Sequence, residues 1–501
     1  MTTAPPAPAE FLQAVTSFAQ QKGFIWGPSP EIYGGLSGFY DYGPLGKLLK
    51  NNVEQAIRAT FQQNEFWEVE CPTVVPSKVW EASGHAGGFH DPLIEAEDGG
   101  IFRVDKLLEE LFPDKEIKPE DYLDVIQKEG ITAPSGAKFK NEIKQHSLMM
   151  KTKVGISIDA YNRPETATTT YLPFLRYFEY FRKKLPFGVF QIGKAYRNEI
   201  SPRQFVVRMR EFTQAEGQLF IYEDTKEEFE KFEQIKGDKL PLLQEGEIVE
   251  KTVEQARKDG NFKNNAYAYT VWLSYKLFTT AGVPHEHIRL RQHRDDEKAF
   301  YADDAWDIEV KLNSFGWTEM CGVHDRTTYD LQQHSKFSGK DLVASDETHK
   351  KETPHILEIA FGVDRIAFAL LDIFYDPKAV EEGKTTFHIP KRLAPIKVGV
   401  FPLMKKDGLD TVAREVYEEL SGMFVCTYDL SGSVGRRYLR AAEGGTPYCV
   451  TVDYQTKEDG TVTLRDRDTE VQVRVHKDEL PSKIDLLLKE KIAFSDVGTP
   501  V

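Results

Sequence analysis

The chain has 501 residues, with 64 Lys and Arg against 79 Asp and Glu, for a formal net charge of −15. Charged residues make up 29% and hydrophobic residues 40%, as in ordinary globular proteins, which excludes a disordered or fibrous chain. The length predicts about three domains or fewer large ones, and the acidic balance argues against a protein that coats nucleic acid by neutralising phosphates. A local basic groove stays compatible with this charge, because binding depends on the local field.

The cysteines and the apolar stretches restrict the class of protein further. Cys71, Cys321, Cys426 and Cys449 lie far apart without C-x-x-C spacing, so we expect neither a disulfide framework nor bound zinc. The N-terminal segment MTTAPPAPAE lacks the basic and apolar regions of a secretory signal. No apolar stretch approaches the roughly 20 residues that span a bilayer. We therefore expect a cytoplasmic protein that contacts no membrane.

The N-terminal region predicts a tail, a helix and a strand. Residues 1–10 are expected to be a flexible tail. Residues 45–61 carry apolar side chains near a 3.6-residue period, and Pro44 stands where a helix-starting proline is tolerated. Residues 66–71 are typical of a short strand, which Pro72 ends.

Residues 11–392 are expected to form one large domain that two charge-rich segments interrupt. These segments, at about 98–150 and 223–290, predict insertions that carry short helices.

The strands of this large domain are predicted from apolar runs. Residues 189–197 and 207–221 predict two strands joined by a polar loop. Strand patterns return at 306–310 and 356–360, and a helix follows Gly362.

The C-terminal region, 393–501, is expected to be a separate small α/β domain. A strand at 397–402, a helix at 409–423 and a strand at 448–452 alternate there. The final 111 residues hold 17 Lys and Arg and 18 Asp and Glu, which leaves 47 of the 64 and 61 of the 79 for the first 390 residues.

This region also clusters three arginines, Arg436, Arg437 and Arg440. They form a candidate nucleic-acid face. A solvated helix face explains the cluster equally well on charge alone.

The usual nucleotide-binding motifs are absent. Gly46-Lys47 lacks the earlier glycine and the following hydroxyl of a P-loop, and no G-x-G-x-x-G follows a strand. What stands out is a set of charged residues in apolar or strand-like sequence. They are Arg163 and Glu165; Arg197 and Glu199; Arg208, Arg210, Glu211 and Glu216; Glu319; and Glu358 with Arg365. One such group alone would favour a structural salt bridge, whereas all of them together favour a site for anionic and cationic groups.

This combination suits the joining of a carboxylate to a nucleotide phosphate. Fixed guanidinium groups can bind phosphate oxygens and stabilise the charge that develops at phosphorus. An aromatic ring such as Phe212 can stack on a base, and carboxylates can hold an ammonium group or Mg²⁺. Arg208, Arg210 and Phe212 share the two-residue period that would place them on one face of a hairpin. The residues therefore predict substrate activation by nucleotidyl transfer.

At these positions the sequence resembles the class II aminoacyl-tRNA synthetases, and specifically the homodimeric type of glycyl-tRNA synthetase. The resemblance is carried by FIWGPSPEIYGGLSGFYDYGPLG, by WEASGHAGGFHDPL at 80–93, by RPETA at 163–167, by FQIGKAYRNEISPR at 190–203 with the REFTQAE that follows, by LEIAFGVDR at 357–365, and by YDLSGSVGRRY, GTPYCVTVDY and DGTVTLRDRDT. It implies an α+β catalytic domain, built on an antiparallel sheet flanked by helices, and a C-terminal α/β anticodon-binding domain. The helix and strand that end at Pro72 would form a dimerisation element.

The resemblance also implies an ATP site. Arg197 would bind the α-phosphate and the activated carboxylate, Glu199 would read the adenine amino group, and Arg365 would lie opposite Phe212 on adenine or at the γ-phosphate. Glu319 would sit beside ATP and its Mg²⁺. In full, the implied ATP site comprises Arg197, Asn198, Glu199, Val207, Arg208, Met209, Arg210, Glu211, Phe212, Glu319, Met320, Gly362, Val363, Asp364 and Arg365. A core position for Phe212 and a structural role for Met320 are the alternatives.

Glycine would bind among carboxylates. It offers only an ammonium and a carboxylate group, so crowded acidic side chains can hold the ammonium and fill the space that a Cβ would need. Glu165, Glu216 and Glu319 would surround the ammonium, and Arg197, Arg365 and Glu216 are the implied catalytic residues. The implied glycine site comprises Arg103, Glu165, Phe212, Thr213, Gln214, Ala215, Glu216, Glu358, Ile359, Ala360, Phe361 and Gly362. A structural role for Arg103 is the alternative.

Two positions depart from the family pattern. Thr168 and Thr169 follow Ala167, where the family often has Gln-Gly, and Ala360 stands where the family has a serine that contacts substrate.

The implied activity is that of a glycine–tRNA ligase. Its substrates would be glycine, ATP and tRNA(Gly), and it would act as a homodimer. A non-catalytic nucleic-acid-binding paralogue, such as a polymerase accessory subunit, and a class II synthetase for another amino acid are the rival hypotheses.

Overall fold

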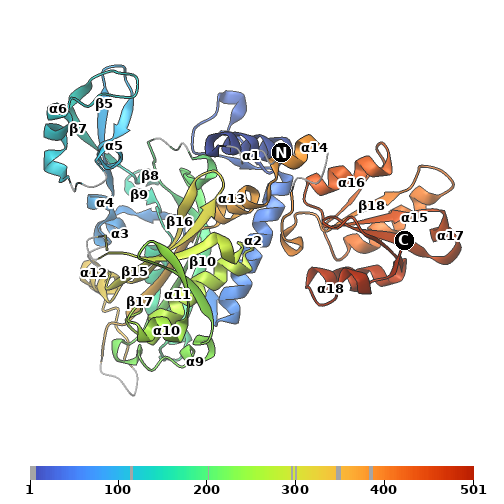
Figure 1. Ribbon diagram of the computed structural model, residues 1–501. Helices are drawn as coiled ribbons and strands as arrows, with labels where there is room; N and C mark the ends of the chain where they lie inside the picture. The colour runs from blue at the N-terminus through green and yellow to red at the C-terminus, as the bar shows by residue number, and fades with distance from the viewer. Residues whose placement is uncertain are drawn as a thin grey trace.

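The computed structural model describes residues 7–112, 115, 117–200, 202, 204–294, 297–298, 302–345, 351–382 and 387–501. A large N-terminal body contains the longest sheet, and a smaller body contains the C-terminal sheet (Figure 1). Within the described part of the chain, no helix is both long enough and apolar enough to cross a membrane.

The large body is built on a nine-stranded sheet. In spatial order its strands are β13 (Glu247–Thr252), β12 (Lys239–Gln244), β14 (Ile288–Gln292), β15 (Asp304–Leu312), β16 (Gly316–Asp325), β17 (His355–Gly362), β11 (Glu211–Ile221), β10 (Phe187–Tyr196) and β3 (Phe66–Glu68). All neighbours are antiparallel except β3 with β10 and β12 with β14. The antiparallel sheet and the strands expected near 306–310 and 356–360 are confirmed.

Three helices cover one face of this sheet, namely α2 (Pro44–Gln63), α11 (Asn265–Thr280) and α13 (Val363–Phe374). The predicted helix at 45–61 is confirmed as α2, whose buried stripe includes Leu49, Val53, Ile57 and Phe61. The Phe61 ring packs directly on Gly217 of β11, where an added Cβ would lie 2.5 Å from the ring. Glycine at that position lets the helix approach the sheet.

The other elements of this body lie around the sheet and these three helices. They are α1 (Pro8–Gln21), β1 (Ile25–Trp26), β2 (Asp41–Tyr42), β4 (Val74–Pro76), α3 (Ser77–Ala82), α4 (His85–Gly88), β8 (Met150–Val154), β9 (Ile158–Asn162), α7 (Ala167–Tyr171), α8 (Phe174–Tyr180), α9 (Phe232–Ile235), α10 (Val253–Lys258), α12 (Tyr329–Ser338) and α14 (Pro377–Glu382). The tail predicted at 1–10 is wrong for residues 8–10, which begin α1 because Phe11 and Val15 bury against the core. Residues 1–6 lie outside the described residues.

The hairpin of β10 and β11 begins later than the sequence predicts. Residues 207–210 were expected to extend the second strand, but Phe205–Val207 form a single helical turn and β11 begins at Glu211. The Arg210 N–H instead donates to the Gly38 carbonyl, 2.8 Å away. Arg208 and Arg210 therefore do not share a strand face with Phe212.

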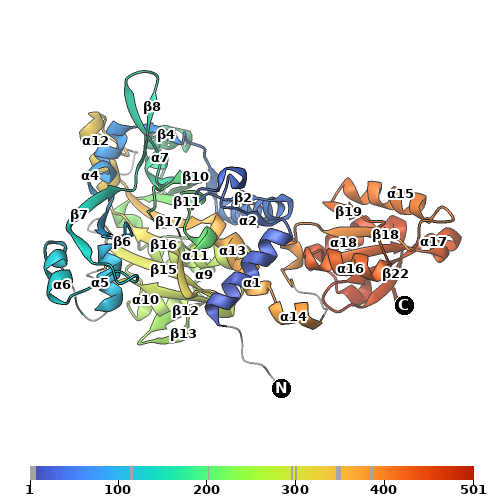
Figure 2. The ribbon, with the colours of Figure 1, turned by 90° about the horizontal axis from the view of Figure 1, so that it is seen from above.

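The first predicted insertion is not purely helical. Strands β5 (His90–Ala96), β6 (Ile101–Arg103) and β7 (Phe139–Ser147) form a sheet of their own, against which α5 (Val104–Leu111) and α6 (Tyr122–Lys128) pack. This unit stands at the side of the main sheet (Figures 1 and 2). The sequence did not predict these strands, because β7 is exposed and its charged side chains hide the alternation of a strand.

The second predicted insertion is not a separate helical segment either. Residues 223–290 supply β12, β13 and β14 to the main sheet, and α11 to its buried core. The helical prediction was wrong for residues 239–252, which form the antiparallel hairpin of β12 and β13. The exposed charged residues of β13 do not show the apolar alternation that predicts a strand.

The C-terminal body confirms the predicted α/β domain. Its sheet has the order β19 (Cys426–Tyr428), β18 (Val398–Pro402), β20 (Tyr448–Val452), β21 (Thr461–Asp466), β22 (Gln472–His476) and β23 (Thr499–Pro500), with helices α15 (Leu409–Ser421), α16 (Val434–Glu443), α17 (Tyr454–Asp459) and α18 (Leu480–Leu488). The first three strands are parallel and the others antiparallel. Lys22, directly after α1, pairs with Glu443 of α16 at 2.7 Å and joins the two bodies.

A buried ion pair connects α2 to the start of α13. Lys50 Nζ lies 2.5 Å from Asp364 Oδ1 and 2.7 Å from Thr213 Oγ1, and both charged side chains are almost fully buried. The Tyr42 hydroxyl and the Thr213 N–H also donate to the Asp364 carboxylate. One carboxylate thus fixes α2, α13 and β11 together.

We predict that Lys50→Met lowers the free energy of unfolding of the large body by about 3–5 kcal/mol, because Asp364 keeps its burial and loses its cation. Denaturant unfolding followed by tryptophan fluorescence measures the change. Lys47→Met, at an exposed position of the same helix, is the matched control and should change stability by less than about 0.5 kcal/mol. Equal effects of the two substitutions would contradict the assigned role of Lys50.

Candidate active site

A cavity of about 270 Å³ opens on the sheet face opposite α2 and α11. It is lined by Glu165, Arg197, Glu199, Val206, Val207, Arg208, Met209, Phe212, Gln214, Glu216, Glu319, Met320, Gly322, His324, Arg326, Glu358, Ala360, Phe361, Gly362, Asp364 and Arg365. Most of the charged residues that the sequence singled out thus come together from four separate segments.

The cavity floor follows the two-residue period of three neighbouring strands. In one row across the sheet, Glu216 of β11 pairs with Ala360 of β17, which pairs with Gly322 of β16. In the next row, Glu358 pairs with His324. The two smallest side chains therefore lie at the centre of the floor, with carboxylates on either side.

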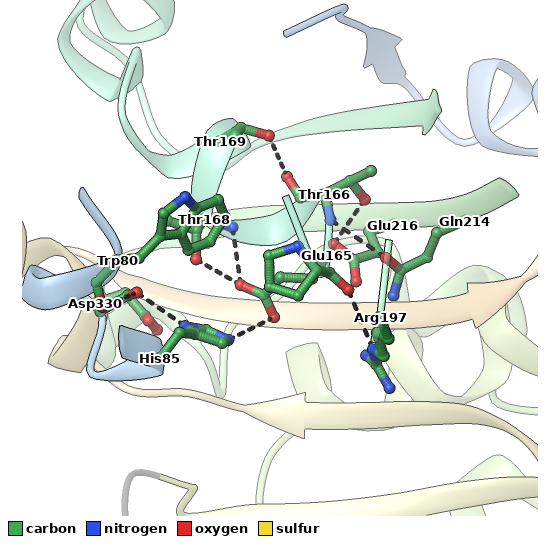
Figure 3. A network of polar contacts seen from close by, with 12 residues as sticks. Trp80, His85, Glu165, Thr166, Thr168, Thr169, Arg197, Gln214, Glu216 and Asp330 are labelled. Atoms are coloured by element: carbon green, nitrogen blue, oxygen red, sulfur yellow. Dashed lines mark hydrogen bonds and ion pairs between the residues drawn. The ribbon is translucent and has the colours of Figure 1, made fainter. Parts of the chain in front are cut away.

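One end of the cavity gathers three carboxylates (Figure 3 shows two of them). Glu216 accepts a hydrogen bond of 2.7 Å from the Thr166 hydroxyl. Glu165 accepts from the Thr168 hydroxyl at 2.5 Å and from its N–H at 3.3 Å. His85 Nε2 lies 3.6 Å from the other Glu165 oxygen.

Glu358, the third carboxylate, has the strongest cationic partner. Its Oε1 lies 3.2 Å from Arg326 Nη1 and 3.4 Å from His324 Nδ1, and its Oε2 accepts from the Tyr171 hydroxyl at 2.6 Å. Arg326 also forms a bidentate ion pair with Asp330. One arginine thus serves two carboxylates.

These contacts separate the protonation states of the three groups. Burial opposes ionisation of Glu165, but His85, Arg326 and Thr168 outweigh it and hold its pKa well below the ordinary value. Burial likewise opposes ionisation of Glu358, yet Arg326 and His324 lower its pKa to about 2. Burial, followed by the charges of Glu358 and Glu165, raises the pKa of Glu216 well above the ordinary value. Glu216 therefore differs from its two neighbours in favouring the protonated form.

Arg163 positions the loop that carries Glu165 and Thr166. Its buried guanidinium donates to the Lys194 carbonyl at 2.7 Å, to the Cys71 carbonyl at 2.9 Å and to Gln191 Oε1 at 2.9 Å. Arg163 is therefore structural, and these partners are carbonyl and amide oxygens, whereas Glu165 of the same charged group lines the cavity.

The other end of the cavity is cationic and aromatic. The Arg197 guanidinium lies 5.5 Å from the centre of the Phe212 ring, and its Nε donates to the Pro164 carbonyl at 3.2 Å. Arg365 donates to the carbonyls of Val207 and Glu319, each at 3.0 Å. Phe212 is thus exposed to the cavity and not confined to the core.

A third arginine of this end is paired. Arg208 Nε lies 3.1 Å from Glu199 Oε2. Arg208 and Glu199 also border a second cavity of about 290 Å³, which Arg103 lines together with Phe102 and Lys106. Arg103 pairs with Asp91 and Asp105 there and does not reach the main cavity.

Several other predicted site residues do not line the main cavity. Thr213, Ala215 and Ile359 point to the opposite face of the sheet, toward the helices, because side chains alternate along a strand, and Val363, at the start of α13, is buried in the core. Asn198, Arg210 and Glu211 lie outside it as well. Arg210 donates to the carbonyls of Ser37 and Glu199, and Glu211 pairs with Lys194 at 3.0 Å. The Asp364 carboxylate is engaged by Lys50, although the residue borders the cavity.

Sequence reasoning missed Val206, Gly322, His324 and Arg326 as cavity residues. The register of β16 against β15 shifts between Glu319 and Cys321. A strict two-residue alternation that starts at Glu319 therefore does not predict that Gly322 and His324 face the cavity. A signal for Arg326 was present, since an arginine next to an apolar strand resembles the other charged groups.

The described residues contain no group of three His, Cys, Asp or Glu side chains arranged to hold a metal ion. Glu319 has an exposed carboxylate at the cationic end of the cavity, and no described basic side chain pairs with it. It is therefore available to a metal ion that arrives with a polyphosphate.

The three clustered arginines of the C-terminal body have different environments. Arg437 is buried and donates to the carbonyls of Pro402 and Gly432, so its prediction as an anticodon-side residue was wrong. Arg440 pairs with Asp429 at 2.5 Å. Arg436 is exposed on α16 and forms no ion pair with a described residue.

Comparisons with known proteins agree with this arrangement. Residues 160–374 match the family described as tRNA synthetase class II core domain (G, H, P, S and T), and residues 397–486 match the anticodon binding domain. The glycine–tRNA ligase of Pyrococcus horikoshii is 39% identical over 96% of this chain and 98% of its own length. The ligases of Thermococcus gammatolerans and Methanothrix thermoacetophila are 38% and 37% identical, over 93% and 98% of this chain and 96% and 99% of theirs.

Identity at this level extends over nearly the whole of both chains and covers the sheet, the cavity and the C-terminal body alike. The chain therefore belongs to the glycine–tRNA ligase family of class II aminoacyl-tRNA synthetases.

Proposed function

We propose that this protein activates glycine with ATP and transfers the glycyl group to the 3′ end of tRNA(Gly). The observation that carries the proposal is the presence, within one cavity, of three converging, largely buried carboxylates at one end and an arginine- and aromatic-lined surface at the other. The first end suits an ammonium group, and the second suits a nucleotide triphosphate.

The reaction needs no protein nucleophile. A glycine carboxylate oxygen attacks the α-phosphorus of ATP, the bond to pyrophosphate breaks, and glycyl-adenylate forms. A hydroxyl of the terminal adenosine of the tRNA then attacks the glycyl carbonyl and displaces AMP. Arg197, at the cationic end, donates to the Pro164 carbonyl next to Glu165, and it would hold the carboxylate and the α-phosphate together while charge develops.

The nucleotide would lie at the cationic end. Adenine would stack on Phe212 in the place that the Arg197 guanidinium now approaches, and Arg365 would contact the base or the terminal phosphates. Mg²⁺ would bind with the phosphates beside Glu319 and neutralise part of their charge.

The rival hypothesis of a non-catalytic paralogue is less consistent with the cavity. A protein that only binds nucleic acid has no use for three buried carboxylates that repel one another and cost stability.

We also propose a homodimer, formed through the edge of the main sheet at β3. Trp67 is 54% exposed there and Tyr180 is 67% exposed, with their rings 6.0 Å apart. Exposed Leu175 and Val74 add to the apolar surface. An open edge strand beside exposed aromatic side chains is typical of a subunit interface.

The C-terminal body would hold the anticodon side of the tRNA. Of its three clustered arginines, Arg437 is buried and Arg440 pairs with Asp429, so Arg436 is the one that is exposed and forms no ion pair with a described residue.

We predict that Arg197→Ala lowers glycine-dependent exchange of pyrophosphate into ATP by at least a hundredfold, because a preorganised donor at the reacting phosphate is lost. Arg414→Ala, an exposed position of α15, is the control and should keep full exchange. A panel of amino acids in the same assay tests the substrate. Exchange with another amino acid, and none with glycine, would overturn the proposed function.

We predict that glycine binding releases protons. The glycine ammonium favours ionised Glu216, whose pKa is raised in the empty site by burial and by its two neighbouring carboxylates. Glycine affinity should therefore fall as the pH is lowered, since protons compete with the ammonium. Calorimetric titrations in buffers of different ionisation enthalpy measure the release, and Glu216→Gln should abolish it. Equal heats in all buffers for the wild-type protein would contradict this prediction.

We predict that Arg436→Glu raises the KM for tRNA in aminoacylation several-fold and leaves pyrophosphate exchange without tRNA unchanged, because it removes one exposed phosphate contact. The salt dependence of the KM should become shallower. An unchanged KM at low salt would place the tRNA on another surface.

A further inference from the structure

At the end of the cavity where glycine would bind, part of the wall comes from residues other than the three carboxylates. Gly322 and Ala360 lie side by side at the centre of the floor, flanked by Glu216 in their own row and by Glu358 and His324 in the next. Two such small side chains would leave a hollow large enough for a substrate methyl group.

The hollow is filled by His324. A Cβ added to Gly322 would lie 2.6 Å from Cε1 of the His324 ring and 3.3 Å from its Nε2. The imidazole therefore folds back along β16 and covers Gly322, while its Nδ1 lies 3.4 Å from Glu358 Oε1. Four-fifths of the side chain is shielded from solvent in this position.

We infer that His324 is a specificity-determining residue, whose ring occupies the space that the side chain of any amino acid larger than glycine would need. The inference rests on the proposed activation of glycine and adds the residue that excludes alanine.

The position of the ammonium supports this assignment. With its nitrogen among Glu165, Glu216 and Glu358, a bound glycine would place its Cα over the row of Ala360 and Gly322, because these residues pair with Glu216 across the sheet. A Cβ directed at the sheet would meet the imidazole edge there. Exclusion by overlap can exceed the discrimination that a missing methyl contact alone supplies.

The same geometry makes Gly322 a supporting residue. Because the ring rests on the glycine backbone, a side chain at position 322 would push the ring up into the substrate space. Substitutions at the two positions should thus act in opposite directions on the size of the pocket.

The test measures pyrophosphate exchange with glycine and with L-alanine for the wild-type protein and three variants. His324→Ala should raise the ratio of alanine to glycine kcat/KM by at least about tenfold. His324→Phe keeps a ring and removes the contact with Glu358, so it should raise the glycine KM but keep the ratio near that of the wild type. Gly322→Ala should lower glycine kcat/KM about tenfold or more without admitting alanine.

Each outcome bears on a separate claim. A wild-type protein that does not exchange with glycine would refute the proposed function itself. If the wild type uses glycine and His324→Ala keeps the wild-type ratio, the inference is wrong. If His324→Phe admits alanine as readily as His324→Ala, discrimination depends on the charge of Glu358 and not on the ring. Thermal unfolding of each variant establishes that it is folded, and Gly322→Ala tests the wall even if a His324 variant is not.

Discussion

The repulsion among three buried carboxylates is the constraint on which the rest of the site depends. Glu165, Glu216 and Glu358 converge from a loop and two strands, and Arg326 compensates only part of their charge. Such a cluster costs folding free energy. The fold tolerates this cost because each carboxylate has its own hydrogen-bond donor, and because the raised pKa of Glu216 favours its neutral form. The carboxylates that would bind the substrate ammonium are thus the same groups that, together with burial, raise the pKa of Glu216.

The sheet keeps the two ends of the cavity apart and in register. Phe212, Gln214 and Glu216 run along one face of β11, so that an aromatic ring, an amide and a carboxylate follow one another at fixed intervals. The opposite face of the same strand packs on helices, and this packing makes the platform rigid. Neighbouring strands add small residues at the centre, which leaves room for a substrate between the cationic and anionic ends.

The helices stabilise this platform through polar contacts as well as apolar packing. Lys50 of α2 reaches the Asp364 carboxylate at the start of α13, next to Arg365, and the same carboxylate binds the backbone of β11. Helix α2, which lies beside the proposed dimer edge, therefore contacts residues next to the nucleotide-binding end of the cavity directly. Arg163 plays the corresponding part on the other side, where it fastens the loop of Glu165.

The sequence by itself determined the helix at 45–61, most strands of the main sheet, the α/β character of the C-terminal body, the family, and most of the residues around the cavity. Local periodicity and short motifs suffice for these features. Tertiary structure alone decided that Arg208 and Arg210 leave the strand, that Arg437 is buried, that residues 239–252 complete the main sheet, and that His324 covers Gly322. In each of these cases the deciding partner, such as the Gly38 carbonyl or the neighbouring strand, is supplied by the folded arrangement. A pattern of apolar and charged residues does not state which carbonyl or ring a side chain will meet.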